Sequence, residues 1–573
     1  MRTPLIALLW IVQGLSISTA ENLPPEGISI LPPSPLTQER VFYSGYNHDH
    51  PVAEAELVEV DYPEFTKAMR VDVIRPNGKF YNGAISLRAT QAVSAGDTLL
   101  IQLYFRSLEN TEESGYGFAT VFLQGPKPNY KKYLIREVTA TDQWQKYTLP
   151  VRVTDDLPVG KLDLSIGAGS GSKPQIWEVG GIELLNYGSS VSPSELPKTQ
   201  GSYIGRDPDA QWRSAAEERI EKHRKGDYRI QILDTCGNPI PGVNIEIEQL
   251  RHAYHFGSAI SAALLTGTSE DSETYREKVL ELFNQSGPEN DLKWPAWKGD
   301  WGKKYQREQT RDALLWLESH HFYTRGHVLV WPSIKHLPQI LHPYLTKDAP
   351  EAVDPIAKQI VLDHIADITT ATSDLLDEWD VVNEPYSNHD FMDAYGQEVM
   401  VDWFKEARKH LPTQALYLND YGILSAGGRD LNHQLHYEQT LRYLLDNQAP
   451  LTGMGMQGHF SNTPTPIDRV YRILDHFHST FPELEIRITE FDVQTDDESL
   501  QADYTRDFLT IAFSHPATVG VQCWGFWAGR HWKPEAAMYT IDWEEKPNAR
   551  IWKELTRKVW WTHHKGVTNR EGS

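Results

Sequence analysis

Eight strand-length apolar runs, each followed by a helical pattern, fill the stretch from residue 255 to residue 526, and they constrain the fold more than any other feature. In the segments between the runs, apolar residues recur at helical spacing, as Val361, Ile365 and Ile368 do. Eight strand–helix repeats over roughly 300 residues are typical of a (β/α)8 TIM barrel. The expected strands are 255–260, 283–289, 323–331, 378–384, 415–421, 453–459, 485–492 and 520–526.

The residues before the expected barrel have a different pattern of apolar residues and turns. Between 21 and 187, short apolar or alternating runs at 98–105, 118–123, 144–151 and 176–185 are separated by glycine- and proline-rich turns. This pattern predicts an all-β, jelly-roll-like sandwich. The chain is therefore expected to be multidomain. The expected parts are a sandwich at 21–187, a linker at 188–210, a helix and a strand pair packed on the barrel at 211–250, and the barrel at 251–573. Within 211–250, the strand pair is expected at 228–249, turning at 236–241.

The first twenty residues have the order of a secretory signal peptide. Arg2 precedes a short apolar core, and small residues end the segment at Ala20. The apolar core is too short for a transmembrane helix. We therefore expect residues 1–20 to be removed and the protein to be secreted, to the extracellular space or the periplasm.

Composition excludes several classes of partner. With 55 Lys and Arg against 78 Asp and Glu, the formal net charge is −23, which argues against nucleic acid and anionic membranes. The two cysteines, Cys236 and Cys523, cannot build a disulfide framework or a structural zinc site, although a single bridge between them stays open. No cofactor or metal motif is present in the sequence, and we expect a monomer.

Two of the expected barrel strands carry a glutamate directly after an apolar run, near where the strand should meet its loop. Glu384 closes the apolar run of strand four, and Glu490 lies in strand seven among polar neighbours. In TIM barrels the active site forms at the carboxyl ends of the strands. Hydrolysis of a glycosidic bond requires two carboxyl groups, one acidic and one nucleophilic or basic. The pair therefore indicates a glycosidase.

Together these motifs resemble glycoside hydrolase family 10, whose characteristic members are endo-β-1,4-xylanases. The resemblance runs from about residue 251 to residue 562 and follows the family order. Besides the two glutamate motifs, it rests on FGSA at 256–259, PENDLKW at 288–294, RGHVLVW at 325–331, QGH at 457–459 and WGFW at 524–527 followed by Trp532.

The resemblance implies a retaining mechanism, with Glu490 as nucleophile and Glu384 as acid/base. In such enzymes the two carboxyl groups lie about 5 to 5.5 Å apart. His459 matches the histidine that hydrogen-bonds the nucleophile, and Asp492 matches the partner of that histidine. Asn383 matches the residue that binds the sugar 2-hydroxyl at the cleavage point.

The remaining matches are sugar contacts of the family. They are Lys293, His327, Trp331 and Gln457 for the sugar at the cleavage point, Glu289 and Asn290 for the next sugar, and Trp524 and Trp532 as aromatic walls. The expected partner is xylan or a related plant cell-wall polysaccharide. The family also joins its barrel to carbohydrate-binding sandwiches, which is the role expected for 21–187.

Residues 332–334, which follow Trp331, depart from the polar loop of many family members, so a distal sugar contact is in doubt. Two alternatives stay open: a β-1,4- or mixed-linkage glucanase on the same barrel, and a non-catalytic polysaccharide-binding protein.

Overall fold

The computed structural model describes residues 27–573 except 38–41, 46–49, 78, 111–116, 141, 170–173 and 346–353. The expected signal peptide at 1–20 lies outside the described residues. The chain divides into two compact units between Thr199 and Gln200.

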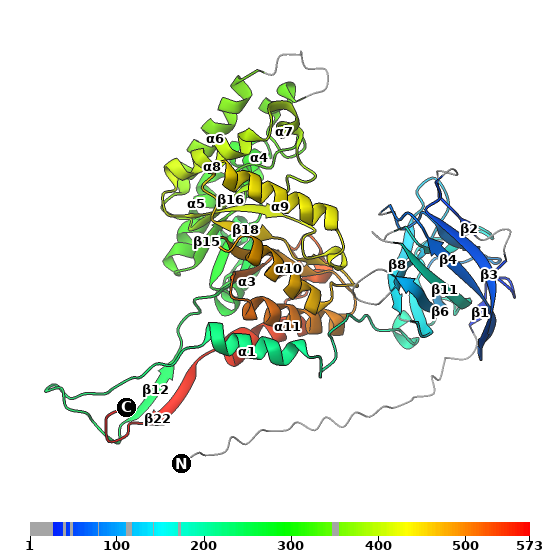
Figure 1. Ribbon diagram of the computed structural model, residues 1–573, viewed down its shortest axis with the longest axis horizontal. Coiled ribbons are helices and arrows are strands. Elements are labelled where there is room, and N and C mark those ends of the chain that lie inside the picture. The colour runs from blue at the N-terminus through cyan, green and yellow to red at the C-terminus, as the bar shows by residue number, and fades with distance from the viewer. Residues whose placement is uncertain are drawn as a thin grey trace. The chain divides into compact units, whose positions relative to one another are not determined.

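The first unit is a sandwich of two antiparallel sheets, as the sequence predicted (Figure 1). One sheet has the order β3 (Ala53–Tyr62), β4 (Phe65–Val73), β11 (Gln175–Asn186), β6 (Thr98–Asn110) and β9 (Gln145–Arg152), and β1 (Ile28–Ser29) pairs with β11. The other has the order β2 (Phe42–Tyr43), β5 (Ala84–Arg88), β10 (Asp163–Gly167), β7 (Gly117–Gln124) and β8 (Lys132–Ala140). Alternate residues of both sheets, such as Leu103, Phe105, Val121 and Trp177, fill the core between them.

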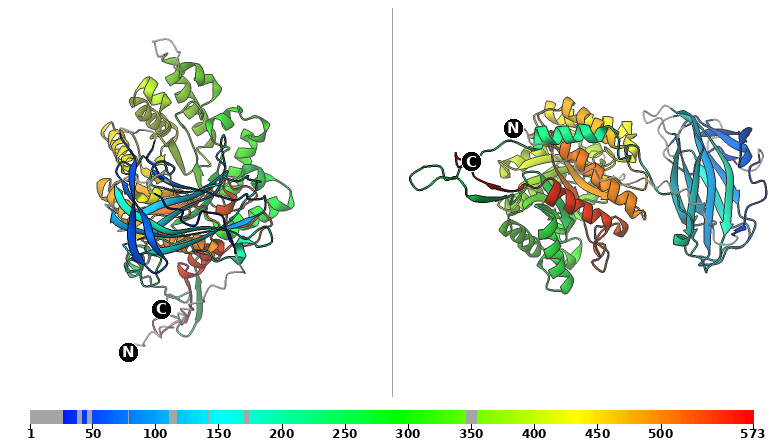
Figure 2. Two further views of the ribbon diagram at one scale, coloured as in Figure 1. Left: turned by 90° about the vertical axis from the view of Figure 1, so that its right-hand side faces the viewer. Right: turned by 90° about the horizontal axis from the view of Figure 1, so that it is seen from below.

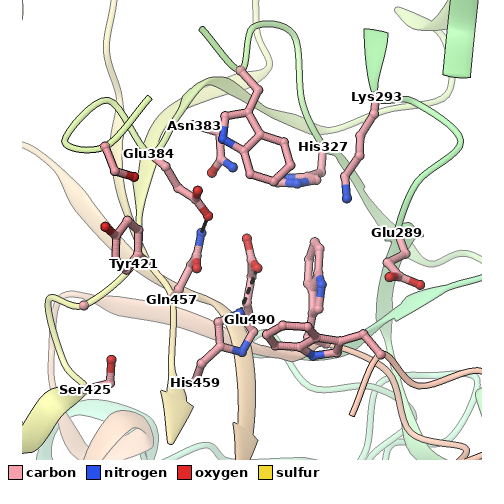
Figure 3. A pocket seen from close by; sticks show the side chains of 15 residues that line it. Glu289, Lys293, His327, Asn383, Glu384, Tyr421, Ser425, Gln457, His459 and Glu490 are labelled. Carbon is pink, nitrogen blue, oxygen red and sulfur yellow. Dashed lines mark hydrogen bonds and ion pairs between the residues drawn. The ribbon is translucent and has the colours of Figure 1, made fainter. Parts of the chain in front are cut away.

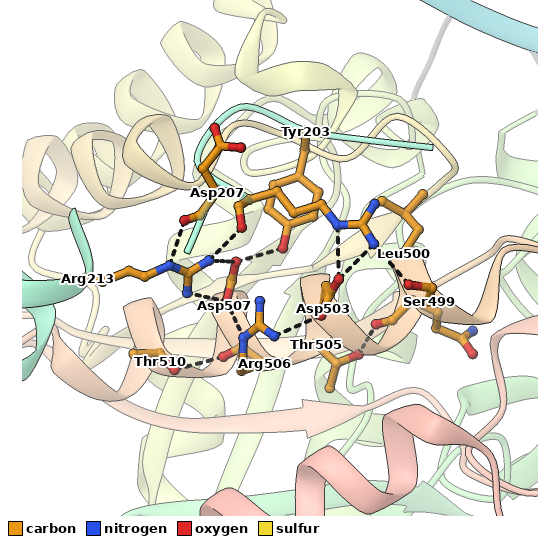
Figure 4. Close-up of polar contacts among 12 residues, drawn as sticks. Tyr203, Asp207, Arg213, Ser499, Leu500, Asp503, Thr505, Arg506, Asp507 and Thr510 are labelled. Carbon is orange, nitrogen blue, oxygen red and sulfur yellow. Dashed lines mark hydrogen bonds and ion pairs between the residues drawn. The ribbon is translucent and has the colours of Figure 1, made fainter. Parts of the chain in front are cut away.

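The expected linker at 188–210 is shared between the two units. In its first part, Ser192 caps the short helix η1 (Pro193–Glu195), and the backbone N–H of Thr199 donates to the carbonyl of Thr148 in β9 at 2.8 Å. Its second part lies on α11 (Glu498–Ser514) of the barrel unit (Figure 4).

Asp507 of α11 is the centre of this second attachment. Its side chain is fully buried and accepts hydrogen bonds from the Tyr203 hydroxyl at 2.7 Å and from the guanidinium of Arg213 at 2.8 Å. Arg506 donates to the same carboxylate at 2.8 Å. Arg206 pairs with Asp503, one turn earlier on the helix, at 2.7 Å. A buried carboxylate held by several donors therefore attaches this segment to the barrel.

The expected strand pair at 228–249 forms only in part. The chain does reverse near residue 236, with a bridge between Leu233 and Pro239. However, β12 (Asn244–Glu248) pairs antiparallel with β22 (His563–Val567), at the far end of the chain, and not with the segment before the turn. Figures 1 and 2 show this ribbon extending away from the barrel, so the pair is not packed on it. The sequence pattern favoured the local partner, because two strands separated by more than 300 residues leave no local signal that they pair.

Within the described residues, eight parallel strands close the barrel, each starting where the sequence predicted it to within two residues. They are β13 (His255–Ile260), β14 (Gln285–Pro288), β15 (Tyr323–Gly326), β16 (Glu378–Asn383), β17 (Ala415–Asp420), β18 (Gly453–Met456), β20 (Glu485–Val493) and β21 (Thr518–Cys523). The pairings of β21 with β13 and of β18 with β20 complete the ring. A short β19 (His459–Phe460) continues strand six beside β20.

Helices surround the strands (Figure 1). They are α1 (Trp212–Arg224), α2 (Ala262–Thr266), α3 (Glu270–Leu282), α4 (Trp294–Lys298), α5 (Arg307–Ser319), α6 (Ile356–Thr372), α7 (Asp390–Tyr395), α8 (Glu398–His410), α9 (Leu431–Asp446), α10 (Ile467–Thr480), α11 and α12 (Pro547–Glu554). Their buried faces cover strands that are themselves buried, such as β16, in which every residue is buried. None of the helices in the described ranges combines the length and apolar character that a membrane crossing requires.

Candidate active site

A pocket of about 540 Å³ opens where the barrel strands end (Figure 3). Eleven of the thirteen predicted site residues line it: Glu289, Lys293, His327, Trp331, Asn383, Glu384, Gln457, His459, Glu490, Trp524 and Trp532. The other two contact these residues, since Asn290 accepts a hydrogen bond from Lys293 at 2.8 Å and Asp492 bonds His459. The predicted residues thus come from six of the eight barrel strands or their following loops and meet in one cavity.

Glu490, on β20, is the more deeply buried of the two glutamates, with 4% of its surface exposed. Its Oε2 lies 3.0 Å from Nε2 of His459, and its Oε1 accepts a hydrogen bond from Asn419 at 2.9 Å. Burial by itself raises the pKa of this carboxyl, but the hydrogen bond from His459, together with the charges of His327, His459 and Arg325, outweighs burial and lowers the pKa below its ordinary value. Glu490 is therefore held as a carboxylate.

The carboxylate of Asp492 stabilises the protonated, positively charged form of His459. Burial favours the neutral imidazole, but the charge of Asp492 and the hydrogen bonds to Asp492 and Glu490 raise the pKa of His459 to about 9. Its Nδ1 lies 2.9 Å from Oδ2 of Asp492, and the indole N–H of Trp532 donates to the same oxygen at 2.8 Å. The imidazolium donates one N–H hydrogen bond to each carboxylate, and these two bonds fix the orientation of its ring.

Glu384 lies at the end of β16 in an unusual backbone conformation. Its φ of 54° falls in the left-handed region, which residues other than glycine rarely adopt. Gln457 donates to its Oε1 at 2.9 Å, and Asn388 donates to its Oε2 at 3.1 Å. Burial, and then the negative charge of Glu490, raise the pKa of Glu384 to about 7. This group can therefore hold a proton near neutral pH and release it.

Hydrogen bonds through Asn419 connect Glu490 to Asn383, the residue before Glu384. Thr489 donates to Oδ1 of Asn419 at 2.7 Å, and Nδ2 of Asn419 donates to both Glu490 and Oδ1 of Asn383, each at 2.9 Å. These bonds leave Nδ2 of Asn383 buried and, within the described residues, without a partner. Nε1 of Trp331 is in the same state. Buried donors without partners in a pocket are suited to bind the hydroxyls of a ligand.

The other end of the pocket is aromatic and basic. The ammonium of Lys293 lies 5.4 Å from the ring centre of Trp331 and 5.9 Å from that of Trp524. Burial lowers the pKa of Lys293, against the opposing charges of Glu289, Glu490 and Glu384. Aromatic faces beside a half-buried cation can make both the apolar and the polar contacts that a sugar ring needs.

His327 is oriented from behind the pocket. Its Nδ1 lies 2.7 Å from Asp380, which also pairs with Arg325. Arg325 in turn lies 3.1 Å from Glu378, and Glu378 pairs with Arg487 at 2.8 Å. This buried ionic layer fills the barrel interior beneath the pocket and fixes the imidazole of His327.

Sequence reading missed several residues of the site. Asn419 follows the apolar run of β17, the same signal that identified Glu384 and Glu490, and it was overlooked there. Figure 3 shows Tyr421 and Ser425 on the opposite side of Glu490 from Glu289 and Lys293. With Ser387 and Gly422, they line the part of the pocket that the predicted set left empty. Asn388 carries no strand-end signal, because it reaches Glu384 from the following loop.

The profile of glycosyl hydrolase family 10 matches residues 247–554, more than half of the chain. The chain is 28% identical over 309 residues to endo-1,4-beta-xylanase 1 of Arabidopsis thaliana, covering 54% of this chain and 31% of that protein. It is 26% identical over 376 residues to the anti-sigma-I factor RsgI6 of Acetivibrio thermocellus, covering 63% and 45%. It thus spans less than half the length of either relative.

Among solved structures, native xylanase 10B from Thermotoga maritima aligns with 54% of this chain and 96% of its own, at 24% identity and a TM-score of 0.47.

Proposed function

Because this chain belongs to glycosyl hydrolase family 10, as its motifs indicated, we propose that it is a secreted, retaining endo-β-1,4-xylanase with Glu490 as nucleophile and Glu384 as acid/base. One observation carries the proposal. Two carboxyl groups share a pocket at the strand ends, and their surroundings move their pKa values in opposite directions, to about 7 for Glu384 and below the ordinary value for Glu490.

These protonation states suit a double displacement. The carboxylate of Glu490 attacks the anomeric carbon while Glu384 gives its proton to the departing glycosidic oxygen, so that a glycosyl-enzyme forms. The ionised Glu384 then takes a proton from water, and the water oxygen displaces Glu490 from the anomeric carbon. One water is consumed, and the configuration at the anomeric carbon is retained. This mechanism requires the two carboxyl groups to lie about 5 to 5.5 Å apart, which stays a prediction.

The free donors of the pocket support a sugar ligand. We infer that Nδ2 of Asn383 binds the 2-hydroxyl of the sugar at the cleavage point, in a contact that strengthens in the transition state. His327, Lys293, Gln457 and Trp331 are the proposed contacts to the same sugar. Glu289 and Asn290 are the proposed contacts to the next sugar, and Trp524 and Trp532 the proposed walls. Xylan is the proposed substrate because relatives of the barrel are named endo-1,4-beta-xylanases.

Two alternatives remain. Xylose lacks the hydroxymethyl group of glucose, so a glucanase requires more room beside Lys293, Trp524 and Trp532. A non-catalytic polysaccharide-binding protein is the other alternative. The complete set of groups around Glu490 favours the enzyme.

The test is reducing-end release from glucuronoxylan, arabinoxylan, carboxymethylcellulose and barley β-glucan, run beside Glu490→Ala. Release from the xylans alone, lost in the variant, is the expected result. Release mainly from the glucans would keep the mechanism and change the substrate. Wild-type turnover by the variant would show that Glu490 is not the nucleophile. No release from any substrate would favour the polysaccharide-binding protein.

We also propose that residues 1–20 direct export, which predicts Glu21 as the first residue of the exported protein. The N-terminal sequence of protein recovered from outside the cytoplasm tests this.

For the sandwich we propose polysaccharide binding, supported by exposed aromatic side chains on loops of its second sheet. Tyr81 and Tyr130 are each 41% exposed and precede β5 and β8. In affinity gels containing xylan, Tyr81→Ala and Tyr130→Ala in the inactive Glu490→Ala chain should migrate faster than their parent. Tyr228→Ala, which removes an exposed tyrosine of the other unit, is the control. Equal retardation of all four proteins would leave the sandwich a spacer.

A further inference from the structure

We propose that Ser333 and Asn388 form a positioning chain that holds the Glu384 carboxyl in the orientation required for proton transfer. The proposal rests on the acid/base role of Glu384. Neither residue lines the pocket, so both act through Glu384 and not on the substrate.

Asn388 is bound to Glu384 at both the backbone and the side chain. Its backbone N–H donates to the carbonyl of Glu384 at 3.0 Å. Its side-chain Nδ2 lies 3.2 Å from the same carbonyl and 3.1 Å from Oε2 of the carboxyl. Asn388 is only 1% exposed. The residue thus closes the turn in which Glu384 takes its left-handed conformation.

Ser333 binds the oxygen of the Asn388 side-chain amide, and the acceptors on Glu384 bind its nitrogen. Its hydroxyl lies 2.9 Å from Oδ1 of Asn388, and its side chain is 4% exposed. With Oδ1 engaged by this hydroxyl, Nδ2 faces Glu384. The reversed amide would direct Oδ1 at the backbone carbonyl of Glu384, which can only accept, and is disfavoured for that reason.

The loop that carries Ser333 is itself tied to the segment after Glu384. The backbone N–H of Phe391 donates to the carbonyl of Pro332 at 3.0 Å, and that of Ile334 donates to Asp390 at 2.9 Å. These are the residues at 332–334 that depart from the polar loop of many family members. In this chain the loop supports the acid/base from behind.

The direction of these hydrogen bonds matters for catalysis. Each oxygen of the Glu384 carboxyl receives one N–H, from Gln457 on Oε1 and from Asn388 on Oε2. An N–H cannot accept a proton, so neither amide draws the acidic proton of Glu384 away from the glycosidic oxygen. A reversed Asn388 amide would accept this proton and turn it away from the substrate.

The experiment compares Ser333→Ala and Asn388→Ala with wild type on two aryl β-xylobiosides, one with a good and one with a poor leaving group. Departure of a poor leaving group requires the proton from Glu384, and departure of a good one does not. We expect kcat/KM for the poor leaving group to fall about tenfold, equivalent to one hydrogen bond to a charged group, and for the good one to stay within about twofold. Ser333→Thr, which keeps the hydroxyl, should restore wild-type behaviour.

The pH profile of kcat/KM is the second readout. An N–H bonded to the carboxylate stabilises the ionised form, so its loss should move the alkaline limb toward higher pH by about one unit. Equal losses on both substrates with an unmoved alkaline limb would overturn the proposal, because that pattern is a general structural defect. Matching melting temperatures confirm that the variants fold, and Ser333→Ala suffices if Asn388→Ala does not.

Glu384→Ala separates this proposal from the proposed function. If that variant shows the leaving-group dependence and Ser333→Ala does not, only the positioning chain is wrong. If Glu384→Ala itself shows no such dependence, the acid/base assignment is wrong and the positioning chain falls with it.

Discussion

Trp532 donates its indole N–H to Oδ2 of Asp492 at 2.8 Å, the oxygen that also accepts from Nδ1 of His459. Trp532, which is proposed to contact sugar, is therefore hydrogen-bonded to Asp492, and Asp492 stabilises the positive charge of His459 beside Glu490. Sugar binding and the ionisation of the proposed nucleophile are connected through this one carboxylate oxygen.

Replacing Trp532 by Phe and by Ala separates these two roles. Phe keeps an aromatic face but loses the N–H, so kcat should fall about three- to tenfold from the lost hydrogen bond while KM changes little. Ala also removes the ring surface and should raise KM by a further factor of about ten. Steady-state kinetics on xylan oligosaccharides measure both values. A Phe variant with unchanged kcat would mean that the indole hydrogen bond is dispensable.

Asp492→Asn should move the acid limb of the pH profile. Without the negative charge of Asp492 the pKa of His459 falls, so Glu490 loses its neighbouring cation and its own pKa rises. The acid limb of kcat/KM then shifts to higher pH, by about one unit or more. His531→Asn, a buried histidine of the same region with no hydrogen bond to either glutamate in the described structure, is the control. An unmoved acid limb would contradict the proposed support of Glu490.

The wild-type protein should show a bell-shaped pH profile of kcat/KM. The alkaline limb follows loss of the Glu384 proton, near pH 7, and the acid limb follows protonation of Glu490, below the ordinary range of a glutamate. Because the two groups interact, the two midpoints belong to the pair. Measuring kcat/KM from pH 3 to 9 tests this. Full activity maintained at pH 9 would contradict Glu384 as the acid.

The free energy of unfolding should also depend on pH through Glu384. The pKa of Glu384 is raised on folding from 4.5 to about 7, so its contribution is fully present below pH 4.5 and is lost as pH rises through 7. Glu384→Gln removes this loss, which amounts to at most about 3 kcal/mol. The melting temperature of the variant minus that of wild type should therefore increase between pH 5 and pH 8. A constant difference would show that Glu384 titrates normally.

Asp507→Ala should destabilise the barrel unit without affecting catalysis. The variant leaves Tyr203, Arg213 and Arg506 without their shared buried acceptor, which costs about 3 to 5 kcal/mol. Glu221→Ala, which breaks an exposed pair with Lys225, should cost less than about 1 kcal/mol. Chemical denaturation measures the free energy of unfolding of both variants. Similar decreases in the two would contradict the proposed role of Asp507 in attaching this segment to α11.

Much of this molecule is predictable because its signals are local. The eight barrel strands each carry their own apolar run, and Glu384 and Glu490 each follow such a run where a parallel strand meets its loop. The closed ring of strands then brings these strand ends together, so the prediction of the fold already implied the gathering of the site. The pairing of β12 with β22 and the orientation of the Asn388 amide carry no local signal.

The sequence by itself determined the barrel, the sandwich and the identity of eleven of the residues that line the pocket, since periodicity and motif order are properties of the chain. Tertiary structure alone decided how those residues are charged. Asp492 keeps His459 protonated, and this imidazolium lowers the pKa of Glu490, whereas Glu384 is buried beside the negative charge of Glu490. Two glutamates with the same intrinsic pKa diverge because burial and neighbouring charge depend on position in space, which only the folded chain defines.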